Sequence, residues 1–375
     1  MEIAVEDAES LSYHRFCKQY MEKNRPVRIK NITKGWSSSL YWKTAKGSLN
    51  FQYLRAIYGD EMVPVCGFAN IAIVAKDMKK QVVQGRAHAH ESHTRTLVNF
   101  REYLQQVESQ TAGLTYLKDW HFHQCCQKRG FKPEYTTPIY FQDDWLNWWS
   151  NRKEMLNHRT DDYRFLYFGP AGTWTPMHYD VLCSFSWSVN ICGRKKWLLF
   201  APEDANNLKD RFGQQVIPDF TATEIDPITY PNIRAARPLE AIQEQDEAMF
   251  VPSGWYHQVT NLTTTISINH NWFNGFNLHH VWAFLQNEIK AIEHELNHLK
   301  CPLGSWTDAE FRSECQKLLQ LNSRMNYTEL FTLLKAKEHQ LEAESVHSAP
   351  YGKAHMIKVH ANHTSRNKVS QKIAS

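Results

Sequence analysis

The sequence predicts a mainly β protein with flanking helices, in which an antiparallel sandwich or barrel occupies the middle of the chain. Short apolar and aromatic segments that end in turn residues follow one another from residue 163 to residue 273. Residues 184–191 alternate polar and apolar side chains, which is the period of a strand. From His280 onward the apolar spacing becomes helical. Serial short strands of this kind are typical of antiparallel sandwiches and barrels.

The strands of this core are separated by turn residues. Gly169-Pro170 ends the first predicted strand, and Gly193 and Ser253-Gly254 mark later turns. The predicted strands cover residues 163–169, 175–180, 184–191, 195–200, 248–252, 255–257 and 264–273.

Four parts make up the predicted chain. Residues 1–110 form a mixed α/β segment that packs on the core, residues 111–275 form the core, and residues 276–342 form C-terminal helices. Residues 343–375 are rich in Lys, His and Ser, so we expect a disordered tail.

Capping residues predict where the helices begin and end. Ser48 is a candidate cap for a helix that Gly59 ends, and Asn99 begins an amphipathic helix that reaches Val107. The C-terminal helices are predicted from 280 to a stop at Pro302, from the N-cap Thr307 to 321, and from 328 to 341.

The composition predicts an intracellular enzyme. The 375 residues include 13% aromatic side chains, which suits a thick β core, and the net charge of +4 does not favour direct nucleic-acid binding. No apolar run approaches the ~18 residues of a membrane span. The acidic N-terminus has no features of a secretory signal, and the eight cysteines include no Cys-x-x-Cys pair. We therefore expect reduced cysteines and a cytoplasmic location, with the nucleus as the alternative; the sequence does not predict an oligomeric state.

His178 and Asp180 are separated by one residue, and His257 follows later in the chain. Alternation along a strand would place His178 and Asp180 on the same side. Two imidazoles and one carboxylate are the ligand set of the facial triad that holds non-heme Fe(II). Such a site leaves coordination positions open for a 2-oxo acid and O2, whereas a structural metal site is closed.

The residues around these ligands resemble the jumonji C family of 2-oxoglutarate oxygenases over most of the chain. Residues 193–197 match the family's Gly-x-Lys-x-Trp element, and residues 251–257 match its Pro-x-Gly-Trp-x-His element. Residues 25–36 resemble its entry strand, and residues 114–122 resemble the first strand of its core. The resemblance implies a double-stranded β-helix, the jelly-roll or cupin-like fold, with Fe(II), 2-oxoglutarate and O2 as metal and cosubstrates.

The same resemblance implies which residues bind 2-oxoglutarate. Lys195 matches the family's cation for the distal carboxylate, while Lys196 should point outward by alternation. A buried Lys without a partner is costly, which is an independent reason to expect an anion there. The other candidates are Tyr116 and Thr175, which match family positions, Ser188 and Asn269, which replace the family's Asn and Thr, and Asn271 as a further donor.

The resemblance extends to a subgroup that hydroxylates lysine in a translation release factor. It implies a protein substrate, most specifically such a release factor, and no additional catalytic side chain beyond the metal site. Three alternatives stay open, of which a zinc protease that uses His294 and His298 is one. The same chemistry can demethylate N-methyl lysine or arginine, and the chain can be an inactive cupin-like binding module.

The sequence His294-Glu-Leu-Asn-His298 matches the H-E-x-x-H signature of zinc proteases. Helical geometry places both histidines opposite the apolar stripe of their helix, so we expect them to face solvent. We interpret His121, His123 and the pair His279-His280 as structural or capping residues. The paired acids 143–144 and 161–162 could attract a basic peptide, but loop or capping roles are more common.

Overall fold

The computed structural model describes residues 2–67, 95–155, 162–297 and 306–347. The chain divides into two compact units. The first contains residues 1–142, 162–180 and 185–271, and the second contains residues 143–161, 181–184 and 272–375. Within the described residues, no helix is long and apolar enough to cross a membrane. No disulfide joins cysteines within the part of the chain that the structure describes.

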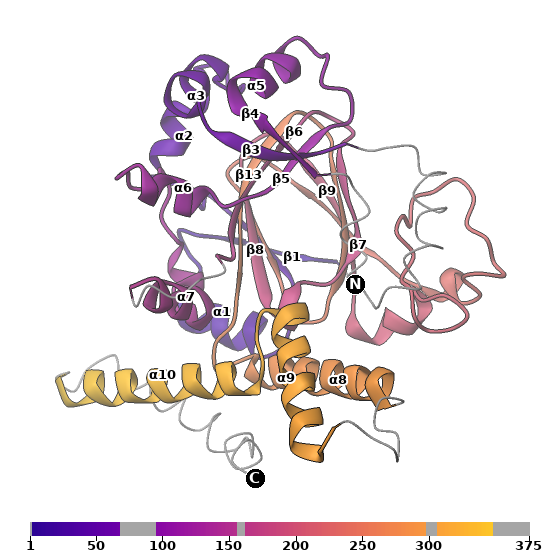
Figure 1. The fold of residues 1–375 in the computed structure, drawn as a ribbon. Helices are drawn as coiled ribbons and strands as arrows, with labels where there is room; N and C mark the ends of the chain where they lie inside the picture. The colour runs from indigo at the N-terminus through magenta and orange to yellow at the C-terminus, as the bar shows by residue number, and fades with distance from the viewer. Residues whose placement is uncertain (1, 68–94, 156–161, 298–305, 348–375) are drawn as a thin grey trace. The chain divides into compact units, whose positions relative to one another are not determined.

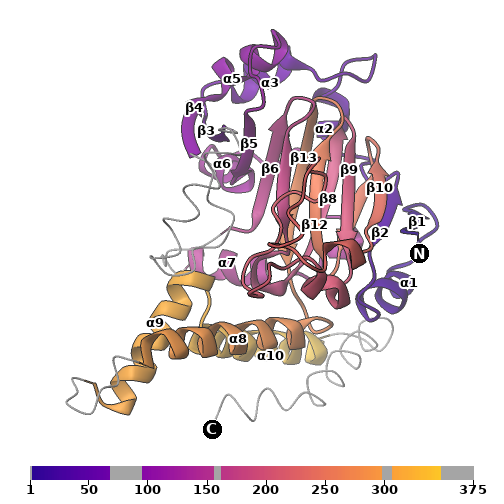
Figure 2. The same ribbon diagram turned by 90° about the vertical axis from the view of Figure 1, so that its right-hand side faces the viewer.

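The first unit contains two sheets (Figure 1). The larger sheet has the order β1 (Ala4–Asp7), β2 (Val27–Lys30), β11 (Ala248–Val251), β8 (Phe185–Cys192), β13 (Thr265–Trp272), β6 (Arg164–Gly169), β5 (Tyr116–Trp120), β3 (Met62–Cys66) and β4 (Arg95–Asn99). The smaller sheet has the order β10 (Leu239–Gln243), β9 (Lys195–Phe200), β12 (Tyr256–Asn261) and β7 (Trp174–His178), and Figure 2 labels β9, β10 and β12 of this sheet.

Strands β6 to β13 form the jelly roll, because four of them pair in each sheet and the two inner faces meet. Trp197 and Val259 from the smaller sheet pack with Met249 and Val251 from the larger one. The fold class predicted from the sequence, a cupin-like jelly roll with helices, is confirmed. Strand β10 was not predicted, because its sequence contains Glu, Ala and Gln, which are depleted in strands.

The N-terminal helices belong to the same unit as the jelly roll. They are α1 (Tyr13–Phe16), α2 (Ser37–Tyr41), α3 (Phe51–Tyr58), α5 (Phe100–Glu108) and α6 (Phe122–Lys128), and a π-helix covers Cys17–Met21. The helix predicted to begin at Asn99 is confirmed, since the Asn99 side chain accepts from the backbone N–H of Glu102. The predicted cap at Ser48 is wrong. Asn50 caps α3, because its side chain accepts from the N–H of Tyr53.

The second unit is helical and contains α7 (Trp145–Met155), α8 (Leu278–Leu296), α9 (Asp308–Ser323) and α10 (Tyr327–His347), with a 3-10 turn at Val181–Cys183. Thr307 caps α9 in a capping box with Glu310, as predicted. The predicted end of the last helix at 341 is wrong, because α10 continues to His347. The rest of the predicted disordered tail, and the stop predicted at Pro302, lie outside the described residues.

Candidate metal centre

The three predicted metal ligands come from two adjacent strands. His178 is the last residue of β7, and it lies directly opposite His257 near the start of β12. The expectation that Asp180 continues the β7 strand is wrong, because β7 ends at His178. Asp180 follows in the connection to a 3-10 turn, so hydrogen bonds and not strand alternation orient it.

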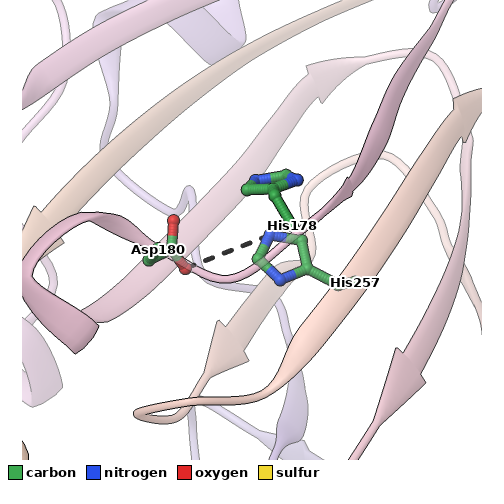
Figure 3. A group of neighbouring side chains, drawn as sticks. All are labelled: His178, Asp180 and His257. Atoms are coloured by element: carbon green, nitrogen blue, oxygen red, sulfur yellow. Dashed lines mark ion pairs between the residues drawn. The ribbon is translucent and has the colours of Figure 1, made fainter. Parts of the chain in front are cut away.

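The ligand atoms of the three side chains converge (Figure 3). They all lie within 4.8 Å of one another, and His257 Nε2 is 4.0 Å from Asp180 Oδ2. The rings of His178 and His257 are 4.1 Å apart between centroids. Among the residues that the structure describes, this is the one cluster of His, Cys, Asp or Glu with the geometry of a metal site.

Backbone carbonyls orient both imidazoles. His178 Nδ1 lies 2.7 Å from the Pro176 carbonyl oxygen, and His257 Nδ1 lies 3.1 Å from that of Trp255. A carbonyl only accepts, so each Nδ1 must carry the proton and each Nε2 keeps its lone pair. This is the usual way in which a protein fixes the tautomer of a metal-binding histidine. The donor set therefore fits iron: two neutral imidazole nitrogens and a carboxylate oxygen.

Two donors hold the Asp180 carboxylate. Asn271 Nδ2 donates to Oδ1 over 2.8 Å, and Ser186 Oγ donates to Oδ2 over 2.7 Å. Asn271 was predicted as a further donor among the cosubstrate residues, and the structure shows its amide donating to the predicted metal ligand Asp180. Ser186 was not predicted, although the polar face of the alternating strand 184–191 contains it.

Lys195 is buried in the jelly roll, with only 2% of its surface exposed. Its ammonium donates to Ser267 Oγ over 2.6 Å, and no described carboxylate forms an ion pair with it. Burial lowers the pKa of Lys195 from its ordinary value to about 7. The neighbouring Lys196 pairs with Glu240 at the surface. The predicted inward and outward directions of these two lysines are confirmed.

A row of hydrogen bonds continues from Lys195 along the inner face of the larger sheet. Ser267 Oγ donates to Asn269 Oδ1 over 3.0 Å, and Ser188 Oγ donates to the same oxygen over 3.2 Å. The structure thus brings the candidates Ser188 and Asn269 into one polar row with Lys195. Ser267, the direct partner of the lysine, was not predicted.

The other two predicted cosubstrate residues also face this interior. Tyr116 is buried, and burial raises the pKa of its phenol well above the ordinary value. A hydrogen bond with the Asn261 side chain lowers the pKa of Tyr116 and so opposes the effect of burial. Asn261 of β12 pairs directly with Lys195 of β9. Thr175 pairs with the inward-facing Val259. His178 pairs with His257 and Thr175 pairs with Val259, so β7 has one residue more than β12 between these two pairs. The extra residue forms a β-bulge, and the bulge turns both His178 and Thr175 inward.

The other candidate histidines and acids, where the structure describes them, are not part of this centre. His294 is exposed, as predicted, and His298 lies outside the described residues. His121 is near the buried Asp162, which accepts from Arg164 Nε. Asp144 caps α7 through the N–H of Asn147, and Asp143 accepts from Trp145 Nε1. These contacts confirm structural roles for Asp143, Asp144 and Asp162, whereas Asp161 lies outside the described residues.

Comparison with known proteins agrees with this geometry. Residues 13–278 match the family model of the cupin-like domain. The chain belongs to the cupin-like jumonji C family. It is 40% identical to the mouse protein "2-oxoglutarate and iron-dependent oxygenase JMJD4" over 88% of this chain and 73% of the relative, and 39% identical to the human protein of that name over 88% and 74%. This jumonji C protein is therefore a 2-oxoglutarate- and iron-dependent oxygenase.

A plant relative has a different name. The Arabidopsis thaliana protein "Arginine-specific demethylase JMJ20" is 34% identical over 88% of this chain and 68% of its own length. The names of these relatives therefore differ in the reaction that they state.

Proposed function

We propose that this oxygenase hydroxylates a lysine side chain of a translation release factor in the cytoplasm. His178, Asp180 and His257 hold the iron, and Lys195 binds the distal carboxylate of 2-oxoglutarate. One observation carries the proposal: the ligand atoms of His178, Asp180 and His257 converge next to strand β9, on which Lys195 is buried with a hydroxyl and no described carboxylate as its partner.

Each residue of the pocket has a defined task. Iron, 2-oxoglutarate and O2 together supply the oxidation, which gives succinate, CO2 and one oxygen atom inserted into a C–H bond. Asn271 and Ser186 hold the Asp180 carboxylate in place. Tyr116, Thr175 and the polar row of Ser188 and Asn269 surround the cosubstrate and limit its orientation. The apolar interior around Trp197 excludes water from the reacting atoms.

Hydroxylation is favoured over demethylation because the mouse and human relatives, which are more similar to this chain than the Arabidopsis demethylase, are named oxygenases. Lysine as the target rests on the resemblance of the sequence to the lysyl hydroxylase subgroup. Arginine or lysine demethylation is the second candidate, and the name of the Arabidopsis relative supports it. The same centre suits both reactions, because hydroxylation of an N-methyl group gives a product that releases formaldehyde.

The test is incubation with purified release factor, Fe(II), 2-oxoglutarate and 18O2. We expect one labelled oxygen in one lysine residue, detected by mass spectrometry of its peptides, and succinate in equal amount. The His178→Ala variant should give neither product, because two ligands do not retain a labile iron. The His294→Ala variant is the matched control and should remain active, since His294 is exposed.

The alternatives predict other products. Formaldehyde from methylated lysine or arginine peptides, with no label in the release factor, would show that the enzyme is a demethylase. Absence of succinate with every protein or peptide offered would favour an inactive binding module.

A further inference from the structure

The β9–β10 loop, residues 201–238, contacts the residues on both sides of both metal-binding histidines. Met177 and Tyr179 flank His178, and Tyr256 and Gln258 flank His257. Met177, Tyr179 and Tyr256 pack in one apolar cluster with loop residues, which are Ala205, Leu208, Val216, Ile217, Phe220, Ile225, Tyr230, Ile233 and Ala236.

Hydrogen bonds attach this loop to each ligand strand. On β7, the N–H of Met177 donates to the Pro218 carbonyl over 2.9 Å. On β12, the Gln258 amide makes three bonds. Its Oε1 accepts from the N–H of Phe220 over 2.8 Å, and its Nε2 donates to Asp219 Oδ1 over 2.7 Å and to Thr221 Oγ1 over 3.5 Å.

Gln258 is the central residue of this attachment. It is 2% exposed, and strand alternation places it on the face opposite His257. A rotation of β12 that moved the His257 ring would also pull the Gln258 amide away from its three partners. A buried amide that loses its partners is costly, so these bonds restrain the rotation.

We propose that Gln258 is a positioning residue, which acts through Phe220 and Asp219 of the β9–β10 loop to hold His257 in the orientation that binds the metal. The inference rests on the proposed iron site. The alternative is a purely structural role, in which Gln258 stabilises the fold and does not affect the orientation of His257. Metal affinity distinguishes the positioning role from the structural role. Loss of a purely structural contact lowers the stability of the protein but leaves the geometry of the metal-ligand atoms unchanged in the molecules that stay folded.

The test uses the full chain, freed of metal, with Mn(II) as an EPR-active probe of the same donors. Gln258→Met keeps an unbranched side chain but removes all three hydrogen bonds of the amide. We expect the dissociation constant for Mn(II) to rise about tenfold, within the 10- to 100-fold range for residues that support metal ligands. The EPR line shape of bound Mn(II) should change as well, which a structural role alone would not cause.

Two further variants complete the design. Gln214→Met makes the same substitution at an exposed position of the same loop and should leave Mn(II) binding unchanged. Asp219→Ala removes one partner and should weaken binding several-fold. The double variant Gln258→Met/Asp219→Ala should bind no more weakly than Gln258→Met, because both changes break the same contact. If Gln258→Met does not fold, Asp219→Ala still tests the proposal.

Mn(II) affinity of Gln258→Met within twofold of the unchanged protein would overturn the inference, whatever its thermal stability. The inference would also be overturned if the losses of Mn(II) affinity in the two single variants multiplied in the double variant. An unchanged Mn(II) affinity in Asp219→Ala would overturn it as well. Failure of the unchanged protein to bind Mn(II) would instead contradict the iron site itself, so the two failures are distinguishable.

Discussion

At the scale of single residues, the proposed binding of 2-oxoglutarate depends on one buried amine, that of Lys195. Lys195 and Lys196 are adjacent in the chain, yet one lies inside the jelly roll and the other pairs with Glu240 at the surface. Burying an ammonium without a carboxylate costs free energy, and an anionic ligand recovers part of it. The two lysines therefore form a matched pair for experiments on 2-oxoglutarate binding.

Lys195→Met should weaken 2-oxoglutarate binding to the Mn(II)-loaded protein by a factor on the order of 10 to 150, the equivalent of a charge-assisted hydrogen bond of roughly 1.5–3 kcal/mol. Lys196→Met should change the affinity less than twofold, because its side chain lies outside. Isothermal titration calorimetry measures both. A larger loss in Lys196→Met would contradict the assignment of Lys195.

The lowered pKa of Lys195 predicts a pH dependence of the same binding step. With a pKa of about 7 in the empty pocket, the ammonium is present below pH 7 and is lost as the pH rises above it. Only the charged form attracts the distal carboxylate, so the dissociation constant should rise about tenfold between pH 6 and pH 8. Lys195→Met should show a flat profile over this interval, and an equal slope in that variant would assign the titration to another group.

At the scale of elements, turns and bulges determine where the site residues point. Gly193 joins β8 to β9 with a φ of +88°, and a Cβ built there would lie 2.4 Å from the Thr264 carbonyl oxygen. The turn thus needs a glycine for its backbone conformation and for the close approach of the chain. It directly precedes the strand that carries Lys195.

Gly193→Ala should therefore lower the free energy of unfolding by about 3 kcal/mol or more, from left-handed strain plus the clash. Gly213→Ala is the matched control. Its φ is +69°, but nothing lies within 4 Å of the added carbon, so we expect a loss of about 1 kcal/mol from strain alone. Urea unfolding of the metal-free proteins compares the two. Equal losses of unfolding free energy in the two variants would show that the chain near Thr264 moves away from the added carbon at little energetic cost.

At the scale of the whole molecule, folding assembles the metal site from parts that are distant in sequence. His178 and His257 meet only because β7 and β12 pair. Ligands that bind the folded site and not the unfolded chain must therefore stabilise the fold.

Mn(II) with 2-oxoglutarate, at about 100 times the dissociation constant, should raise the free energy of unfolding by about 2.7 kcal/mol. Differential scanning calorimetry should show this as an upward shift of the transition. The His257→Ala variant should show no shift, since it lacks one of the three donors. A shift of the same size in that variant would mean that the ligands bind elsewhere.

The sequence by itself determined the features that depend on local pattern. Alternation predicted the strands β8, β9 and β13 and the opposite directions of Lys195 and Lys196. Capping chemistry predicted the start of α5 at Asn99 and of α9 at Thr307. These features are predictable because each depends on residues within a few positions of one another.

The tertiary structure alone decided the contacts between distant segments. Asp180 leaves the strand that alternation had predicted, and Asn271 and Ser186 orient it. Ser267 bonds Lys195, and Gln258 joins a ligand strand to the β9–β10 loop. No local pattern contains these pairs, because strand pairing and the packing of the loop on the smaller sheet bring them together only when the chain folds.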